Sequence, residues 1–283
     1  MLTFSKMHGI GNDYIYINCF QETVTDPEKL SIFMSNVRFG VGSDGLVLIL
    51  PSEVADFRMR IFNADGSEAM MCGNATRCVG KYVYEHGMTN KTEVSLETNS
   101  GIKYLTLYVN EATNKVDAVK VDMGKAILKP AEIPVADDGD RFIAKPVVVD
   151  GVSYDMTCVS MGNPHAVVFL PEIDSLDLEK MGPSFEHHPL FPNRVNTEFI
   201  RVIDDHTLQM RVWERGSGET FACGTGACAA AVASVLNGYC KREQEILIHL
   251  RGGDLRIIYH NDESVTMIGP ATFIFEGKME YPV

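Results

Sequence analysis

The sequence has no apolar run that approaches the roughly 20 residues required for a membrane-spanning helix, so no membrane partner is expected. Residues 1–8 also lack the long apolar core of a secretion signal. Cationic residues are few, because 25 Lys and Arg stand against 38 Asp and Glu, a formal net charge of −13. Since nucleic-acid binding requires a basic patch, no nucleic-acid partner is expected either.

Cysteine is sparse and odd in number, with seven residues in a chain of 283. A disulfide framework needs a denser, even set, so we expect free thiols in a reducing cytoplasm. Hydrophobic residues make up 45% and charged residues 22% of the chain, as in an ordinary soluble globular protein. Short apolar runs between turn residues dominate, which indicates a chain rich in β-sheet.

Two segments 151 residues apart are nearly copies of each other. Residues 59–75 and 210–226 both begin Met-Arg, carry Gly-Ser and Glu further on, and place a cysteine 13 residues after the Met. The two cysteines are Cys72 and Cys223. Such a repeat indicates two similar structural units, here with one reactive side chain duplicated. A weaker similarity pairs residues 42–51 with residues 162–171, each a turn, an apolar strand and a proline.

Each repeated cysteine precedes a predicted helix. After Cys72, apolar residues fall on one helical face, and Gly87 is a suitable stop. After Cys223 the sequence is apolar nearly all round until Asn237 and Gly238, which indicates a buried helix. Further helices are predicted near residues 27–36 and 176–182.

A cysteine at a helix start lies where free backbone N–H groups and the helix dipole favour an anion. We therefore expect a thiol pKa below the usual value of about 8.5. The same N–H groups can bind a substrate carboxylate. Two such helix starts could place one sulfur on each face of an α-carbon. One sulfur as thiolate and the other as thiol would then remove a proton from one face and return one to the other.

Other roles for cysteine are weighed against this one. A lone cysteine is usually a small buried hydrophobe, the interpretation we give to the five remaining ones, Cys19, Cys78, Cys158, Cys228 and Cys240. A zinc site is disfavoured because the short ligand spacings and a His pair are missing, so no metal is expected. A cysteine nucleophile with His165 as base would leave the second cysteine unexplained.

Eight short motifs, spread in order over nearly the whole chain, resemble those of the diaminopimelate epimerase family. They comprise residues 9–13 (GIGND), 40–45 (GVGSDG), 62–67 (FNADGS), 71–77 (MCGNATR), 162–165 (GNPH), 195–198 (VNTE), 214–216 (ERG) and 222–226 (ACGTG). Many members of that family carry Gln where this chain has Gly45, so a side-chain contact from that position is missing here.

The resemblance implies an α/β (α+β) fold of two domains related by a pseudo-twofold axis. Each domain would be a mostly antiparallel β-sheet curled around a central helix, with the active site between the domains. Because the C-terminal strand of that fold returns to the first domain, we expect one domain of residues 1–118 plus 263–283 and a second of residues 119–262.

The resemblance also implies cofactor-independent interconversion of LL- and meso-diaminopimelate, in lysine and peptidoglycan precursor biosynthesis. Cys72 and Cys223 would be the acid–base pair, and His165 and Glu214 would tune it or orient the substrate. The small-molecule substrate would be the main partner, and a homodimer is expected. Residues implied to bind the substrate are Asn12, Asn63, Gly73, Asn74, Asn163, Asn196, Glu214, Arg215, Gly224 and Thr225.

Three rival functions remain. Proline and hydroxyproline epimerases also place two cysteines at helix starts, but Gly-His usually follows the first, where this chain has Gly73-Asn74. Isomerases of the phenazine-biosynthesis type share the fold, and the presence of both cysteines disfavours them. A redox sensor or ligand-binding module would exchange no α-proton of any amino acid.

Overall fold

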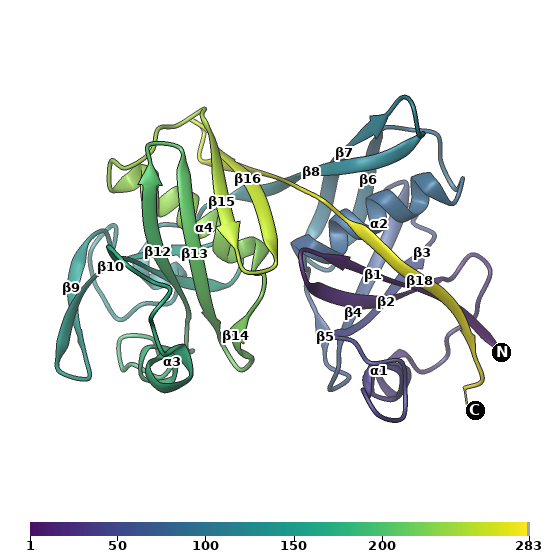
Figure 1. Ribbon diagram of the computed structural model, residues 1–283, viewed down its shortest axis with the longest axis horizontal. Helices are drawn as coiled ribbons and strands as arrows, with labels where there is room; N and C mark the ends of the chain where they lie inside the picture. The colour runs from purple at the N-terminus through teal and green to yellow at the C-terminus, as the bar shows by residue number, and fades with distance from the viewer. Residues whose placement is uncertain (282–283) are drawn as a thin grey trace. The chain divides into compact units, whose positions relative to one another are not determined.

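The computed structural model describes residues 1–281 of the protein (Figure 1). The chain divides into two compact units, one formed by residues 1–122 with the segment from 268 onward, the other by residues 123–267. In the described part of the chain, no helix is long and apolar enough to cross a membrane.

The first unit is built mainly from strands, with one short and one longer helix. Its elements are β1 (Leu2–Gly9), β2 (Asn12–Asn18), α1 (Pro27–Ser35), β3 (Gly45–Leu50), β4 (Phe57–Asn63), β5 (Glu68–Ala69), α2 (Gly73–Glu85), β6 (Glu93–Thr98), β7 (Gly101–Asn110), β8 (Lys115–Lys125) and β18 (Thr272–Met279).

The second unit has the same composition of elements. They are a single 3₁₀ turn (Pro130–Glu132), β9 (Lys145–Val149), β10 (Val152–Ser160), β11 (Pro164–Phe169), α3 (Leu178–Glu186), β12 (Asn196–Asp204), β13 (Thr207–Glu214), β14 (Gly218–Thr220), α4 (Gly224–Leu236), β15 (Glu245–Leu250), β16 (Gly253–Tyr259) and β17 (Ser264–Gly269).

Strand pairing follows one pattern in both units. In the first, β2 is parallel to β3, β3 is antiparallel to β4, and β4 pairs antiparallel with β5 and parallel with β6. In the second, β11, β12, β13, β14 and β15 pair in the same order and directions. The C-terminal strand β18 pairs antiparallel with β1 and so completes the sheet of the first unit.

This pattern corrects the weaker similarity read from the sequence. Residues 42–51 contain β3, and residues 162–171 contain β11. However, β3 corresponds in topology to β12, and β11 corresponds to β2. The pairing of these two segments was wrong because a turn, an apolar strand and a proline recur in many strands, whereas the neighbours of a strand identify it.

The two longer helices begin where the sequence predicts. Cys72 is the N-cap of α2 and Cys223 is the N-cap of α4, both with extended backbone. Gly87 and Gly238, just beyond the helix ends, have φ values of +67° and +80°, which glycine adopts without strain. Residues 227–233 of α4 are fully buried, because alanine-sized side chains allow sheet to pack closely around the helix.

The two shorter helices both begin at an aspartate that caps them. The side chain of Asp26 accepts the N–H of Lys29, and that of Asp177 accepts the N–H of Lys180. Helix α1 agrees with the predicted range, whereas α3 ends at Glu186, four residues beyond the predicted 182. Helix α1 packs on β3 and β4, and α3 packs on β12, β13 and β14 (Figure 1).

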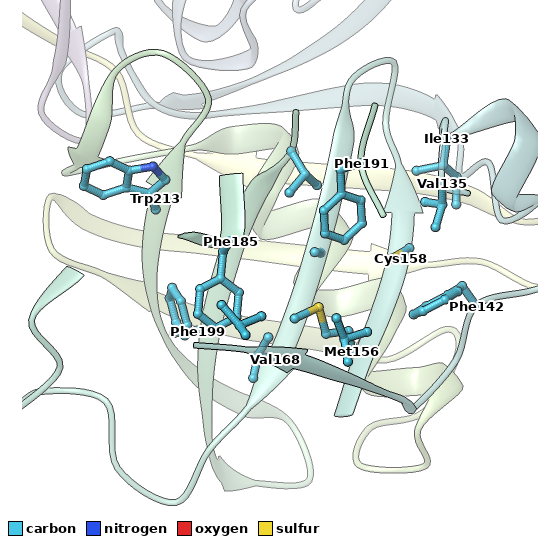
Figure 2. Packing of buried hydrophobic residues seen from close by; sticks show 14 of the residues in the cluster. Ile133, Val135, Phe142, Met156, Cys158, Val168, Phe185, Phe191, Phe199 and Trp213 are labelled. Carbon is cyan, nitrogen blue, oxygen red and sulfur yellow. The ribbon is translucent and has the colours of Figure 1, made fainter. Parts of the chain in front are cut away.

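Aromatic side chains pack α3 onto the sheet of the second unit (Figure 2). The rings of Phe185 and Phe199 meet edge to face with centroids 5.1 Å apart. Trp213 packs over Gly182, where an added Cβ would lie 2.2 Å from the indole. The end of β13 is thus fixed by a buried core. The predicted fold class, a sheet-rich α/β protein with few helices, is confirmed.

Candidate active site

In the first unit, the thiol of Cys72 lies at the start of α2. Its carbonyl accepts the first helical hydrogen bond, from Thr76 N at 2.9 Å, and its Sγ lies 3.4 Å from Oδ1 of Asn12. Gly73 and Asn74 open the helix, so their N–H groups have no carbonyl one turn earlier to bind. These donors can receive a carboxylate next to the sulfur.

The amide of Asn12 is oriented by a carboxylate. Its Nδ2 donates to Oδ2 of Asp44 at 2.8 Å, and the backbone N–H of Asp13 donates to the same oxygen at 3.0 Å. The Oδ1 of Asn12 is therefore turned toward the helix start, where it also accepts Nδ2 of Asn74 at 3.2 Å. Cys72, Asn12 and Asn74, all predicted site residues, form one hydrogen-bonded group.

Arg77 supports this group, and sequence reasoning gave it no role. Its side chain is fully buried in α2, and it donates to Oδ1 of Asn74 at 2.9 Å and to the carbonyl of Pro270 at 3.1 Å. Gly9 leaves room for it, because a Cβ there would lie 2.9 Å from the guanidinium. An arginine within a helix predicted to be buried on one face indicates such a role, because a buried charge requires hydrogen-bond partners.

Asn63, another predicted binding residue, ends β4. Its Nδ2 donates to Oγ of Ser67 at 3.0 Å, and its carbonyl accepts Oγ of Ser31 at 2.8 Å. Gly45 pairs with Asn63 on the neighbouring strand. A Cβ at Gly45 would lie 2.0 Å from the carbonyl oxygen of Phe62, so this backbone admits no larger residue there without moving the strands apart.

In the second unit, Cys223 occupies the position that Cys72 has in the first. Its carbonyl accepts Ala227 N at 2.9 Å, and its Sγ lies 3.6 Å from Oγ1 of Thr225. The side chain is 5% exposed. Gly224 and Thr225 open α4, so their N–H groups are available to an anion as in the first unit.

The electrostatic setting of Cys223 differs from the one expected of a helix start. Burial raises the pKa of the Cys223 thiol well above its usual value, and the carboxylates of Glu214 and Glu198 raise this pKa further. The expectation of a lowered thiol pKa is therefore wrong for this cysteine. Burial likewise raises the pKa of Glu214, which accepts the hydroxyl of Thr220 at 2.5 Å. A protonated thiol is the favoured resting form of Cys223.

His165 is fully buried between two acceptors. Its Nδ1 lies 2.7 Å from Oε1 of Glu198, which is also fully buried, and its Nε2 lies 3.0 Å from Oδ1 of Asn163. The imidazole ring of His165 therefore connects Glu198 and Asn163 through its two nitrogens. No role was expected for Glu198 from the sequence, although it follows Asn196 by two residues on β12.

Asn196 holds the turn that follows β13. Its Oδ1 accepts the backbone N–H of Arg215 at 2.8 Å. The guanidinium of Arg215 is exposed and donates to the carbonyl of Asn193 at 3.0 Å. Asn196 therefore orients the backbone at Arg215, and the exposed guanidinium of that arginine is accessible to an anionic ligand.

Potential metal ligands also occur in the second unit. Within residues 1–281, Asp204, Asp205 and His206 place one ligand atom each within 4.8 Å of one another. All three are exposed and lie between the end of β12 and the start of β13, at the opposite end of β13 from Glu214. They are no part of the group around Cys223.

Each unit thus presents a cysteine and two free N–H groups at a helix start, with amide side chains in the first and carboxylates in the second. The sequence model of the diaminopimelate epimerase family matches residues 4–129 and 157–274. The chain belongs to the diaminopimelate epimerase family. It is therefore an isomerase.

Curated family members match it along nearly their whole length. The diaminopimelate epimerase of Acetivibrio thermocellus is 58% identical over 280 residues, 99% of each chain. That of Methanococcus maripaludis is 52% identical over 280 residues, 99% of this chain and 100% of the relative.

Solved structures agree with this chain in fold. A probable proline racemase from Agrobacterium radiobacter, 14% identical, gives a TM-score of 0.74 over 100% of this chain and 94% of its own. A hydroxyproline epimerase from Agrobacterium vitis, 16% identical, gives 0.70 over 98% and 91%.

Proposed function

We propose that this protein interconverts LL- and meso-diaminopimelate without a cofactor, with Cys72 and Cys223 as the two acid–base groups. The observation that carries the proposal is the duplication itself: each cysteine is the N-cap of a Cys-Gly helix, in two units of the same strand topology. The 58% identity to a diaminopimelate epimerase supports the choice of substrate.

The reaction removes the proton from the α-carbon by a thiolate and adds a proton to the opposite face from a thiol. The electron pair of the broken C–H bond spreads into the α-carboxylate. Backbone N–H groups at both helix starts, those of Gly73, Asn74, Gly224 and Thr225, would bind that carboxylate and stabilise the charge as it develops. The reverse reaction needs the opposite protonation of the two sulfurs, which is why two groups of one kind suit it.

The two cysteines would start from different states. Because burial, Glu214 and Glu198 raise the pKa of Cys223, we assign Cys223 as the thiol of the free enzyme and Cys72 as the base. Proton removal by Cys72 would then leave the proton of Cys223 to be delivered to the other face. Turnover in the opposite direction would begin after the roles have exchanged.

The remaining predicted residues would bind the second amino-acid group of the substrate. Asn63 is the last residue of β4, and Arg215 directly follows the last residue of β13. The Arg215 guanidinium is exposed. Asn163, Asn12 and Asn196 would supply amide groups. We place the reaction in lysine and peptidoglycan precursor biosynthesis, in the cytoplasm, and expect a homodimer.

Proton NMR of LL-diaminopimelate in deuterated buffer with reductant tests this function. We expect loss of the α-proton signal and formation of the meso isomer, with no exchange in parallel samples of proline and glutamate. Exchange of proline instead would keep the two-thiol chemistry and overturn the substrate. No exchange in any sample would overturn the proposed reaction.

A further inference from the structure

One charge pair recurs at the same place in both copies of the sequence repeat. In the first unit, Arg60 donates to Glu68 through two parallel bonds, Nε to Oε1 at 2.8 Å and Nη2 to Oε2 at 2.9 Å. In the second, Arg211 donates to Glu219 in the same way, at 2.8 and 3.0 Å. A bidentate pair fixes the orientation of two side chains as well as their distance.

Both pairs bridge the same short hairpin in the same register. Glu68 lies opposite Phe62, and Arg60 is two residues earlier on that face of β4. Glu219 lies opposite Trp213, again two residues beyond its arginine. Because β5 has two residues and β14 three, the backbone ladder supplies few hydrogen bonds, and the side-chain bridge adds two more.

The hairpins hold the residues on which the proposed reaction depends. The turn after β4 begins at Asn63, and the turn after β13 begins at Glu214 and Arg215. The returning strands β5 and β14 each end three residues before a catalytic cysteine, Cys72 or Cys223. Each bridge therefore lies between a substrate-binding turn and a reacting sulfur.

The Arg211–Glu219 pair of the second unit is more buried than the Arg60–Glu68 pair of the first. The side chains of Arg211 and Glu219 are 13% and 9% exposed. The remaining terminal nitrogen of Arg211, Nη1, donates to three carbonyls at 2.7 to 3.0 Å. They belong to Ile173, Asp174 and Leu176. This arginine ties the hairpin to the loop that precedes α3.

An ordinary surface pair in the same unit shows the contrast. Arg256 and Glu245 meet through one 3.6 Å contact, and both side chains are more than two-fifths exposed. Such pairs contribute little to stability, typically 0 to about 1 kcal/mol. The Arg60–Glu68 and Arg211–Glu219 pairs differ from the Arg256–Glu245 pair because they are bidentate, more buried and located in the hairpins next to the cysteines.

We propose that Arg60–Glu68 and Arg211–Glu219 are positioning pairs, each of which aligns the substrate-binding turn and the cysteine of its own unit. The inference rests on the proposed function for its catalytic consequence. Its structural consequence, local order of the hairpin, can be measured without turnover.

The test uses Glu68→Gln and Glu219→Gln, which remove one charge and leave the arginines in place. Keeping Arg211 matters, because its loss would strip three carbonyls of their donor and could unfold the unit. Glu245→Gln is the matched control. For each variant we would measure the melting temperature, kcat and KM for LL-diaminopimelate at 25 °C, and amide hydrogen exchange of the segments 63–72 and 214–223.

We expect kcat/KM to fall at least about tenfold in Glu219→Gln, since small misplacement of reacting groups is costly, and less in Glu68→Gln, whose pair is more exposed. Faster amide exchange should be confined to the hairpin of the mutated unit. The control variant, Glu245→Gln, should change neither kcat/KM nor the amide exchange of either hairpin. A lower melting temperature with unchanged kcat/KM would show a merely structural pair and overturn the proposal.

An exchanged pair tests the geometry directly. In the first unit, Arg60→Glu combined with Glu68→Arg restores a bridge of opposite direction, and we expect most of the kcat/KM lost in the single variants to return. Failure of this rescue would overturn a positioning role for that pair. If the wild type turns over no diaminopimelate, the proposed function fails, while local amide exchange still decides whether the pairs order their hairpins.

Discussion

The Sγ atom of Cys72 lies 3.4 Å from Oδ1 of Asn12, an uncharged acceptor. Cys223 instead has Glu214 and Glu198 as neighbours, which together with burial raise its thiol pKa. Two cysteines at equivalent helix starts thus differ in these side-chain neighbours.

We expect this inequality to appear in thiol reactivity. Iodoacetamide should modify Cys72 at least about tenfold faster than Cys223 near neutral pH, because thiolate is the nucleophile and Cys223 is 5% exposed. The difference should narrow as the pH rises toward the pKa of Cys223. Quenched alkylation with peptide mapping measures both rates in one sample, and faster modification of Cys223 would contradict the assigned resting states.

Replacing either catalytic cysteine should abolish epimerisation. Cys72→Ala and Cys223→Ala each remove one of the two groups that the proposed mechanism needs on opposite faces, so activity should fall to below a few per cent of wild type. Cys19→Ala and Cys240→Ala are the controls, one in each unit, and should retain activity. Circular dichroism should show an intact fold in all four. Substantial epimerisation by either catalytic variant would remove the two-base mechanism.

Glu214→Gln should make the protein more stable and less active. The pKa of Glu214 is raised by burial, so the folded state binds its proton more tightly than the unfolded state does. The stability from this group is complete below the unfolded pKa and is lost as pH rises through the folded pKa. At pH 7 the unfolded state ionises this carboxyl more readily than the folded state, so the group lowers stability there. Gln, which can still accept the Thr220 hydroxyl, should remove that cost.

We expect Glu214→Gln to raise the melting temperature by roughly 2–4 °C at pH 7, while kcat falls about 100-fold through the loss of the carboxyl group beside Cys223. Near pH 4 the two proteins should melt at similar temperatures, because the carboxyl is protonated in both states of the wild type. Calorimetry at both pH values checks this. A variant less stable than wild type at pH 7 would contradict it.

Gly182→Ala should destabilise the second unit although alanine favours helices. Helix propensity alone would stabilise α3 by about 1 kcal/mol, but the new Cβ would lie 2.2 Å from the ring of Trp213. Overpacking of this kind typically costs 1 to about 3 kcal/mol, so the net change should be unfavourable. Trp213 is the one tryptophan in the chain, so its fluorescence reports the displacement. Lys180→Ala, exposed on the same helix, should leave the emission unchanged, and a more stable Gly182→Ala would refute the packing argument.

Much of the fold could be read from the sequence because its signals are local. The cysteine, glycine and apolar spacing that begin and end α2 and α4 act over one or two helical turns, and both helices lie where they were predicted. The repeat likewise indicated two units of one topology. Alternation of short apolar runs was too general to match individual strands, which is why the segment containing β3 was paired with the wrong strand of the second unit.

The sequence by itself determined the family, the helix starts and the residues at them. Only the tertiary structure decided how those residues are tuned. Glu198 lies beside His165 because β11 and β12 pair in parallel, and near Cys223 because α4 packs on β12. Arg77 reaches Pro270 across 193 residues of sequence. Hydrogen bonding at a helix start depends on neighbours in the chain. Desolvation and charge depend on every group that folding brings near, so the raised thiol pKa of Cys223 had no local signature.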